Sequence, residues 1–111
     1  MLIVYGIPNC DTIKKTLQWL KTDQIEFQFY DYKKEGISRE KLEDWSKQVA
    51  WTQLLNRTGT TFKKLSEEQK MAIKDADSAI QFMKENPSAI KRPVIEQNNQ
   101  IIKIGWEPEG I

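Results

Sequence analysis

The beginning of this chain joins a short apolar run to an amphipathic segment through a turn, and this order of elements restricts the fold more than any other feature. Leu2, Ile3, Val4 and Tyr5 form a continuous apolar run, which is typical of a strand covered on both faces in a parallel sheet. Apolar residues then recur at helical spacing opposite lysine and glutamine side chains, which predicts a helix over about residues 11–22. A chain with this start is expected to be an α/β protein.

A second strand and a turn are predicted after this helix. Ile25, Phe27 and Phe29 alternate with polar residues, as in a half-buried strand. Polar and turn-forming residues at positions 31–36 are expected to close that strand as a turn. A strand, a helix and a second strand in this order predict a right-handed parallel crossover.

The middle of the chain, from about residue 38 to residue 90, has helical periodicity. Leu42, Trp45 and Val49 share one face of a predicted helix, and we interpret Gly59 as a helix stop. These helices are expected to form an insertion between the strands.

The end of the chain predicts an antiparallel hairpin. A capping box at Ser66 and a proline stop at Pro87 delimit the helices before it. Residues 94–96 and 101–104 then form two apolar runs separated by residues 97–100. We therefore expect one domain over residues 1–111, with a mixed sheet of about four strands and a helical insertion over about residues 38–90.

Cys10, the only cysteine, lies where the first turn gives way to the helix. At a helix N-terminus, backbone N–H groups without helical partners and the positive end of the dipole favour a thiolate over a thiol. A lone cysteine is more often a small buried hydrophobe, but the Pro-Asn-Cys-Asp-Thr context favours a reactive nucleophile. Asp11 opposes ionisation through its like charge, and Lys14, one turn later, offsets it.

Composition excludes several other classes of protein. The chain has no histidine, which excludes a histidine-activated cysteine and mixed Cys/His metal sites, so we predict no metal. Seventeen basic and sixteen acidic residues give a net charge of +1, which argues against a nucleic-acid binder. One cysteine, no signal-peptide pattern and no long apolar stretch predict a cytoplasmic protein without membrane association.

Four motifs along the chain resemble one known family. They are, in order, Gly6-Ile7-Pro8-Asn9-Cys10-Asp11-Thr12, Lys14-Lys15-Thr16-Leu17, Lys91-Arg92-Pro93-Val94-Ile95 and Gly105-Trp106-x-Pro108. They resemble the arsenate reductase (ArsC)/Spx family of thioredoxin-like proteins, and most closely its small YffB-type branch, over essentially the whole chain. The resemblance implies that the mixed sheet with its inserted helical subdomain is thioredoxin-like.

The resemblance also implies which residues form the site. Pro93 would be in the cis form and face Cys10, which is the implied nucleophile. Arg92 would then project toward the thiolate, and Arg57 matches a second arginine at the end of the insertion's first helical stretch. Arg92 and Arg57 would stabilise an anionic sulfur or hold an anionic substrate in bidentate fashion. The residues that would bind substrate are Asn9, Asp11, Thr12, Lys14 and Pro93.

The third arginine that cradles the oxyanion in arsenate reductases has no match in this chain. Ile102, Lys103 and Ile104 occupy the region where it would fall. Arg39, the remaining arginine, is interpreted as a solvent-facing residue at a helix start. Because a lysine supplies charge but no planar fork, arsenate is a doubtful substrate.

Two functions from different classes follow from the resemblance. Spx regulators typically carry a Cys-x-x-Cys switch, whereas the position three after Cys10 is Ile13, so no intramolecular disulfide can form. The first function is a single-cysteine thiol oxidoreductase that takes its resolving thiol from glutathione as co-substrate, with or without glutaredoxin, and has no bound cofactor. The alternative is a non-catalytic Spx-like adaptor that binds a protein such as RNA polymerase. The physiological substrate and the oligomeric state stay open.

Overall fold

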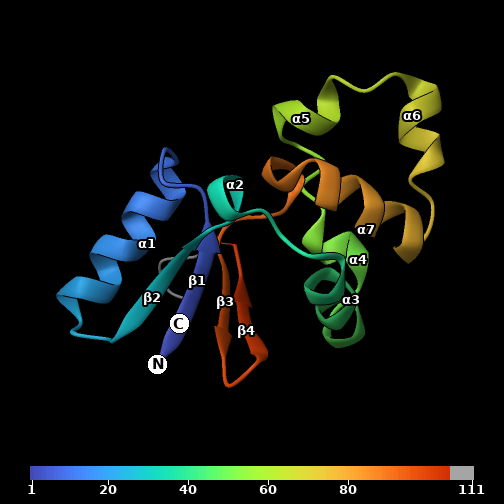
Figure 1. Cartoon of the computed structure of the whole chain (residues 1–111). Helices are drawn as coiled ribbons and strands as arrows, with labels where there is room; N and C mark the ends of the chain where they lie inside the picture. The colour runs from blue at the N-terminus through green and yellow to red at the C-terminus, as the bar shows by residue number, and fades with distance from the viewer. Residues whose placement is uncertain (106–111) are drawn as a thin grey trace. The chain divides into compact units, whose positions relative to one another are not determined.

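The structure, a computed structural model, describes residues 1–105 and contains two compact units (Figure 1). The sheet unit comprises Met1–Glu35 and the described chain from Arg92 onward, and the helical unit comprises Gly36–Lys91. The helical unit covers nearly the same residues as the predicted insertion, while folding of the whole chain as one domain stays a prediction. The predicted Trp106 and Pro108 motif residues lie outside the described residues.

The sheet unit is built on a mixed four-stranded sheet with the strand order β2-β1-β3-β4. Its strands are β1 (Leu2–Gly6), β2 (Phe27–Asp31), β3 (Val94–Gln97) and β4 (Gln100–Ile104). The pair β1 and β2 is parallel, whereas the β1–β3 and β3–β4 pairs are antiparallel. This arrangement confirms the predicted α/β fold, with β2 shifted toward later residues than the alternating pattern indicated.

Helix α1 (Asp11–Thr22) covers the sheet with its apolar face. Leu20 is buried together with Leu2, Val4 and Ile95 of the sheet, and Leu17 packs against this cluster. The helix coincides with the predicted range of residues 11–22, because the apolar spacing that predicted it is the same spacing that buries one face.

The β3–β4 hairpin closes with a turn in which two asparagines have positive φ angles. These angles are 54° at Asn98 and 65° at Asn99, values that asparagine tolerates better than most residues. The hairpin is therefore confirmed where the sequence predicted it. On β3, the buried carboxylate of Glu96 accepts a hydrogen bond of 2.7 Å from the hydroxyl of Tyr5 on β1.

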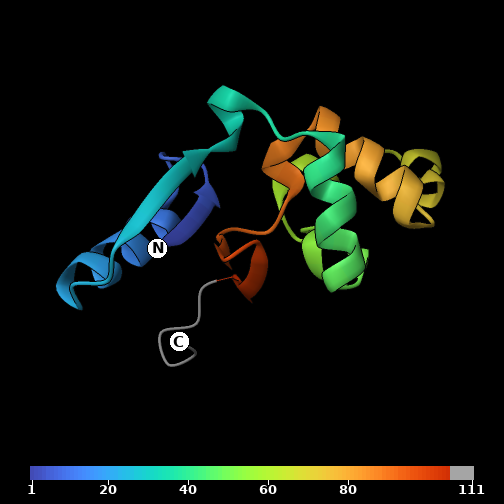
Figure 2. The same cartoon turned by 60° about the horizontal axis from the view of Figure 1, so that its bottom comes forward.

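The helical unit consists of short helices (Figure 2). They pack around a small apolar core. Leu42 and Trp45 on one helix and Ile80 and Met83 on another are buried. Its elements are α3 (Arg39–Gln48), α4 (Trp51–Leu54), α5 (Thr60–Lys63), α6 (Glu67–Ala72), α7 (Ala76–Glu85) and the 3-10 turn η1 (Pro87–Ala89).

Two predicted helix boundaries are confirmed by their capping hydrogen bonds. At the start of α6, the backbone N–H of Gln69 donates to Ser66 Oγ, and the backbone N–H of Ser66 donates to Gln69 Oε1 at 2.9 Å. Helix α7 ends with Asn86 as its C-cap, directly before Pro87. Within residues 1–105, none of the helices is long and apolar enough to span a membrane.

Three local predictions were wrong or incomplete. Residues after Asp31 form the short helix α2 (Tyr32–Glu35) rather than only a turn. Gly59 precedes α5 as its N-cap with a φ of −79°, so it starts a helix instead of stopping one. Arg39 is not merely solvent-facing, because its guanidinium donates to Glu43 on α3 and to Asp77 on α7.

Candidate active site

The strand registers bring three separate segments to one edge of the sheet. Asp31, the last residue of β2, lies level with Gly6, the last residue of the parallel strand β1. Val94, the first residue of β3, lies level with Tyr5 because β3 runs antiparallel to β1. The chain after Gly6, the chain after Asp31 and the chain before Val94 therefore meet at this edge. These segments carry Cys10, Tyr32 and the Arg92-Pro93 pair, respectively.

Cys10 is the N-cap residue of α1, as the sequence predicted. Its backbone is extended, and its carbonyl accepts the first helical hydrogen bond from the N–H of Lys14 at 2.9 Å. Its side chain makes no capping hydrogen bond to the helix, and the free thiol is partly exposed. The sulfur is therefore available for chemistry, and its role as a nucleophile stays a prediction.

Gly6 allows α1 to approach the end of β1 closely. A Cβ atom at Gly6 would collide with the Cδ1 atom of Ile13 and would lie 2.8 Å from its Cγ1 atom. Ile13 is fully buried one turn after Cys10, so it has little room to move away. The absence of a side chain at Gly6 thus helps to set where the helix begins and where the thiol lies.

The Arg92-Pro93 peptide bond is cis, as the family resemblance implied. Pro93 is buried, and its carbonyl accepts a hydrogen bond of 2.8 Å from the N–H of Gly105, which anchors this segment to the end of β4. Arg92 is half-buried beside it. This anchoring places the Arg92 backbone at the same edge of the sheet as Cys10.

Tyr32 is a residue of this edge that the sequence reasoning missed. It is completely buried at the start of α2. Burial is the main cause that raises the pKa of the Tyr32 phenol, while the charge of Arg92 lowers this pKa and that of Cys10 raises it. The phenol, the guanidinium and the sulfur thus share one electrostatic environment. An aromatic residue between a strand-ending aspartate and two lysines was the signal available in the sequence.

The residues predicted to bind substrate lie on the Cys10 loop and on the first turn of α1. Asn9, Asp11 and Lys14 are exposed, and Thr12 is half-buried with its carbonyl accepting a hydrogen bond from Thr16. A cavity of about 440 Å³ opens beside this loop, lined by Pro8 and by residues of β2 and α2. Their roles in binding, like that of Pro93, stay predictions.

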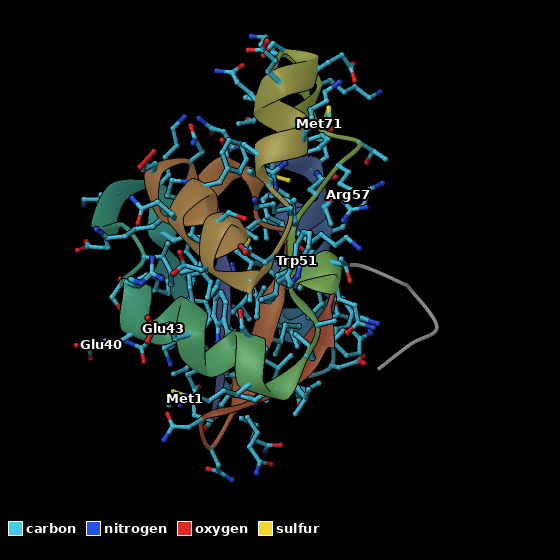
Figure 3. All side chains as sticks on the ribbon, turned by 90° about the vertical axis from the view of Figure 1, so that its right-hand side faces the viewer. Met1, Glu40, Glu43, Trp51, Arg57 and Met71 are labelled. Carbon is cyan, nitrogen blue, oxygen red and sulfur yellow. The ribbon has the colours of Figure 1, made fainter. Side chains whose placement is uncertain are left out.

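Arg57 belongs to the helical unit rather than to the unit that carries Cys10. Its exposed guanidinium lies over the ring of Trp51, 5.4 Å from the ring centroid, in a cation–π contact (Figure 3). Just before it, Leu55 forms an isolated antiparallel bridge with Ile90. The catalytic role assigned to Arg57 stays a prediction.

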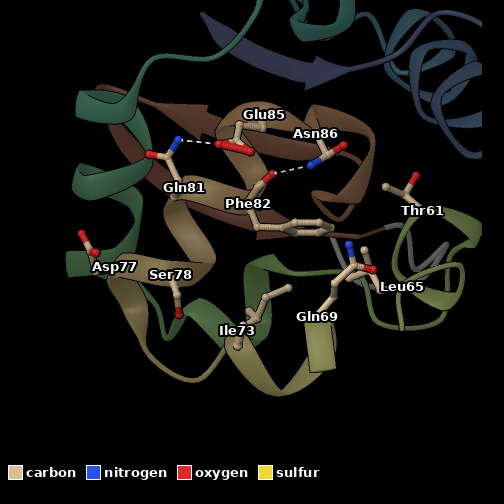
Figure 4. A pocket seen from close by; sticks show the side chains of 11 residues that line it. Thr61, Leu65, Gln69, Ile73, Asp77, Ser78, Gln81, Phe82, Glu85 and Asn86 are labelled. Carbon is tan, nitrogen blue, oxygen red and sulfur yellow. Dashed lines mark hydrogen bonds between the residues drawn. The ribbon is translucent and has the colours of Figure 1, made fainter. Parts of the chain in front are cut away.

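The helical unit also contains a cavity of about 600 Å³, shown in Figure 4. Leu65, Ile73 and Phe82 supply apolar parts of its wall. Around them lie polar side chains, among them Gln81, which donates to Glu85 at 2.7 Å. None of the residues predicted to carry the thiol chemistry lines this cavity.

Comparison with known proteins decides the family. The model of the ArsC family matches residues 5–111, which is nearly the whole chain. The chain belongs to the ArsC family. An uncharacterized protein of Haemophilus influenzae is 39% identical over 102 residues, covering 92% of this chain and 89% of that protein.

Solved structures of family members share the fold. A protein named YFFB is 44% identical with a TM-score of 0.90, covering 98% of this chain and 94% of that chain. An arsenate reductase (ArsC) related protein from Brucella melitensis is 47% identical with a TM-score of 0.82, covering 96% of this chain and 88% of that chain. Family membership and this fold indicate a redox protein with an arsenate reductase-like architecture.

A protein named as a regulator is also similar to this chain. The regulatory protein MgsR of Bacillus subtilis is 28% identical to this chain over 110 residues, covering 96% of this chain and 84% of the regulator. Similarity to known proteins alone therefore does not separate an enzyme from a regulator.

Proposed function

We propose that this protein is a glutathione-dependent thiol oxidoreductase that uses Cys10 as its single nucleophile. The observation that carries the proposal is the convergence of a partly exposed thiol at a helix N-terminus with the cis Arg92-Pro93 segment at one edge of the sheet.

The proposed reaction needs two thiol–disulfide exchanges. In the first, the Cys10 thiolate attacks the glutathione sulfur of a glutathionylated substrate, and the substrate thiolate leaves, so that Cys10 carries the glutathione as a mixed disulfide. In the second, a glutathione thiolate attacks that glutathione sulfur and releases oxidised glutathione and the Cys10 thiolate. Each cycle consumes one glutathione thiol, the other half of the oxidised glutathione comes from the substrate, and no second cysteine of this chain is required.

Arg92 is proposed to stabilise the anionic sulfur of Cys10 and to orient a carboxylate of glutathione. A guanidinium offers a planar pair of donors, which a carboxylate accepts in a bidentate geometry. The cavity beside Pro8 provides space next to the thiol loop for part of the substrate. Arg57 is proposed to act mainly on the substrate, and glutaredoxin is proposed as a further source of the resolving thiol.

Because glutathione is kept reduced in the cytoplasm, we propose that location for the protein.

A coupled assay tests this function. Reduction of a glutathionylated peptide by glutathione is followed through consumption of NADPH by glutathione reductase, with the wild-type protein and with Cys10→Ser. We expect the wild type to exceed the uncatalysed rate and the variant to match it. Equal rates for both proteins would contradict a catalytic Cys10.

The second candidate is an adaptor that binds a protein such as RNA polymerase, and its support is the relationship to the regulator MgsR. An adaptor of this kind would keep its partner when the thiol is removed. Binding of purified RNA polymerase to the wild type and to Cys10→Ser distinguishes the two. Equal, saturable binding by both proteins, together with no turnover by either, would favour the adaptor.

A further inference from the structure

The cavity of about 600 Å³ in the helical unit (Figure 4) lies outside the set of residues to which the thiol chemistry is assigned. We propose that this cavity binds a small organic cation, in which an aromatic or branched apolar body carries an ammonium group. Binding sites for small molecules usually have volumes of roughly 300–1,000 Å³, so the cavity is large enough for such a ligand. The inference goes beyond the proposed function and does not depend on Cys10.

Part of the cavity wall is an apolar surface that a ligand can cover. Leu65, Ile73 and Phe82 line the cavity, and each of them is only half-buried. They come from three segments of the helical unit, namely the loop before α6, the C-cap of α6 and the middle of α7. A ligand that removes this surface from water gains free energy, which favours a ligand with an apolar body.

The charged residues of the wall are acidic. Asp77 and Glu85 line the cavity, and no lysine or arginine of the described chain lines it with them. The guanidinium of Arg39 neutralises Asp77 in an ion pair. Glu85, in contrast, accepts a hydrogen bond of 2.7 Å from the neutral amide of Gln81 and forms no ion pair within residues 1–105. The wall therefore carries one negative charge that no cation compensates.

Two further features favour a cation at the same end of the wall. Glu85 is the last residue of α7, and the C-terminal end of a helix carries the negative end of its dipole. Lys84, the basic residue of this turn, does not line the cavity. The side-chain amide of Asn86 donates to the carbonyl of Phe82 at 3.1 Å, and its amide oxygen accepts no hydrogen bond from another described residue. A carboxylate and an amide oxygen thus offer acceptors to an ammonium group, which has only donors.

Three ligands with the same indole body and different charges test this proposal. Tryptamine is a cation, tryptophol is neutral, and indole-3-acetate is an anion. Each is titrated into the isotope-labelled wild-type protein, and its dissociation constant is taken from the backbone NMR signals of Ile73, Phe82 and Asn86. We expect saturable shifts with tryptamine and about fivefold weaker binding of tryptophol, which is the upper end for an exposed ion pair. Indole-3-acetate should bind more weakly still, and methylamine, which lacks the apolar body, should cause no saturable shift.

Glu85→Gln tests the position of the cation. This substitution removes the charge and keeps an oxygen that can accept from Gln81, and Glu85 is exposed, so we expect the fold to be retained. Glu68→Gln is the matched control, because Glu68 is an exposed glutamate of α6 that does not line the cavity. We expect Glu85→Gln to bind tryptamine and tryptophol about equally and Glu68→Gln to keep the wild-type preference for tryptamine.

Four results would overturn the proposal or part of it. If neither tryptamine nor phenethylamine causes a saturable shift at the cavity, the cavity is not a site for organic cations. Equal affinities of the wild type for tryptamine and tryptophol would show an apolar groove without charge selection. A preference for tryptamine that persists in Glu85→Gln would overturn the position of the cation. Much tighter binding of a blocked peptide with tryptophan next to lysine would overturn the assignment to a small molecule and favour a protein partner.

Discussion

Gly6→Ala tests whether close packing between β1 and α1 sets the position of the thiol. The added Cβ atom would collide with Ile13 Cδ1 and lie 2.8 Å from its Cγ1 atom, well inside ordinary contact. Because Ile13 is fully buried and its side chain has little room to turn away, we expect the collision to be relieved mainly by movement of the helix or the strand. Either movement displaces the helix N-terminus at which Cys10 lies.

The expected cost follows from overpacking of a dense core. Such substitutions destabilise proteins by about 1–3 kcal/mol, and for a domain of this length about 2 kcal/mol lowers the melting temperature by roughly 9 °C. Ile13→Val removes Cδ1, the first atom in the collision, and by itself costs about 0.5–1.5 kcal/mol. The double variant should therefore lose at least about 1 kcal/mol less than the sum of the single variants.

The assay is chemical denaturation of the wild type, both single variants and the double variant, with iodoacetamide alkylation of Cys10 measured in parallel. We expect Gly6→Ala to change the alkylation rate and the added Ile13→Val to restore it in part. Strictly additive losses of stability, or an alkylation rate in Gly6→Ala equal to that of the wild type, would refute the idea that this contact positions the thiol.

Three further predictions concern the arginines. Arg92→Lys keeps the charge but loses the planar fork, so glutathione-coupled turnover should fall about 10- to 100-fold while iodoacetamide alkylation of Cys10 changes little; undiminished turnover would argue against bidentate binding. Arg57→Ala should leave alkylation unchanged and weaken substrate use, seen as a higher KM; a change in alkylation alone would reverse the assignment of the two arginines. Arsenate reduction should be weak or absent because two arginines replace three, and robust glutathione-coupled arsenate turnover by the wild type would contradict this.

The elements predicted correctly are those with strong local signals. Short stretches of sequence are enough to predict β1 from its apolar run, α1 from its helical spacing and the hairpin from its two apolar runs. The capping box of Ser66 and Gln69 is similarly local, since both of its hydrogen bonds form within one turn. The cis bond before Pro93 came from the family resemblance, because nothing in the local sequence distinguishes it from a trans bond.

The features that were missed depend on contacts between distant residues, or on a residue type that can serve either end of a helix. The local sequence pattern encodes neither. Asp31 caps the turn after β2 and Tyr32 is buried there, although the surrounding residues are charged. Gly59 was interpreted as a stop because glycine often ends helices, but its extended backbone serves equally as a start. Arg39 links α3 to α7 through Asp77, a partner 38 residues away in the sequence.

Intact-mass analysis of the protein after incubation with oxidised glutathione tests the central claim most directly. Because Cys10 is the only cysteine, any mixed disulfide with glutathione must be on this residue, and Cys10→Ser is the matched control. The account predicts one glutathione adduct on the wild type, none on the variant, and complete release of the adduct by reduced glutathione. A wild-type protein that forms no adduct, or an adduct that reduced glutathione does not release, would contradict a glutathione-dependent cycle at Cys10.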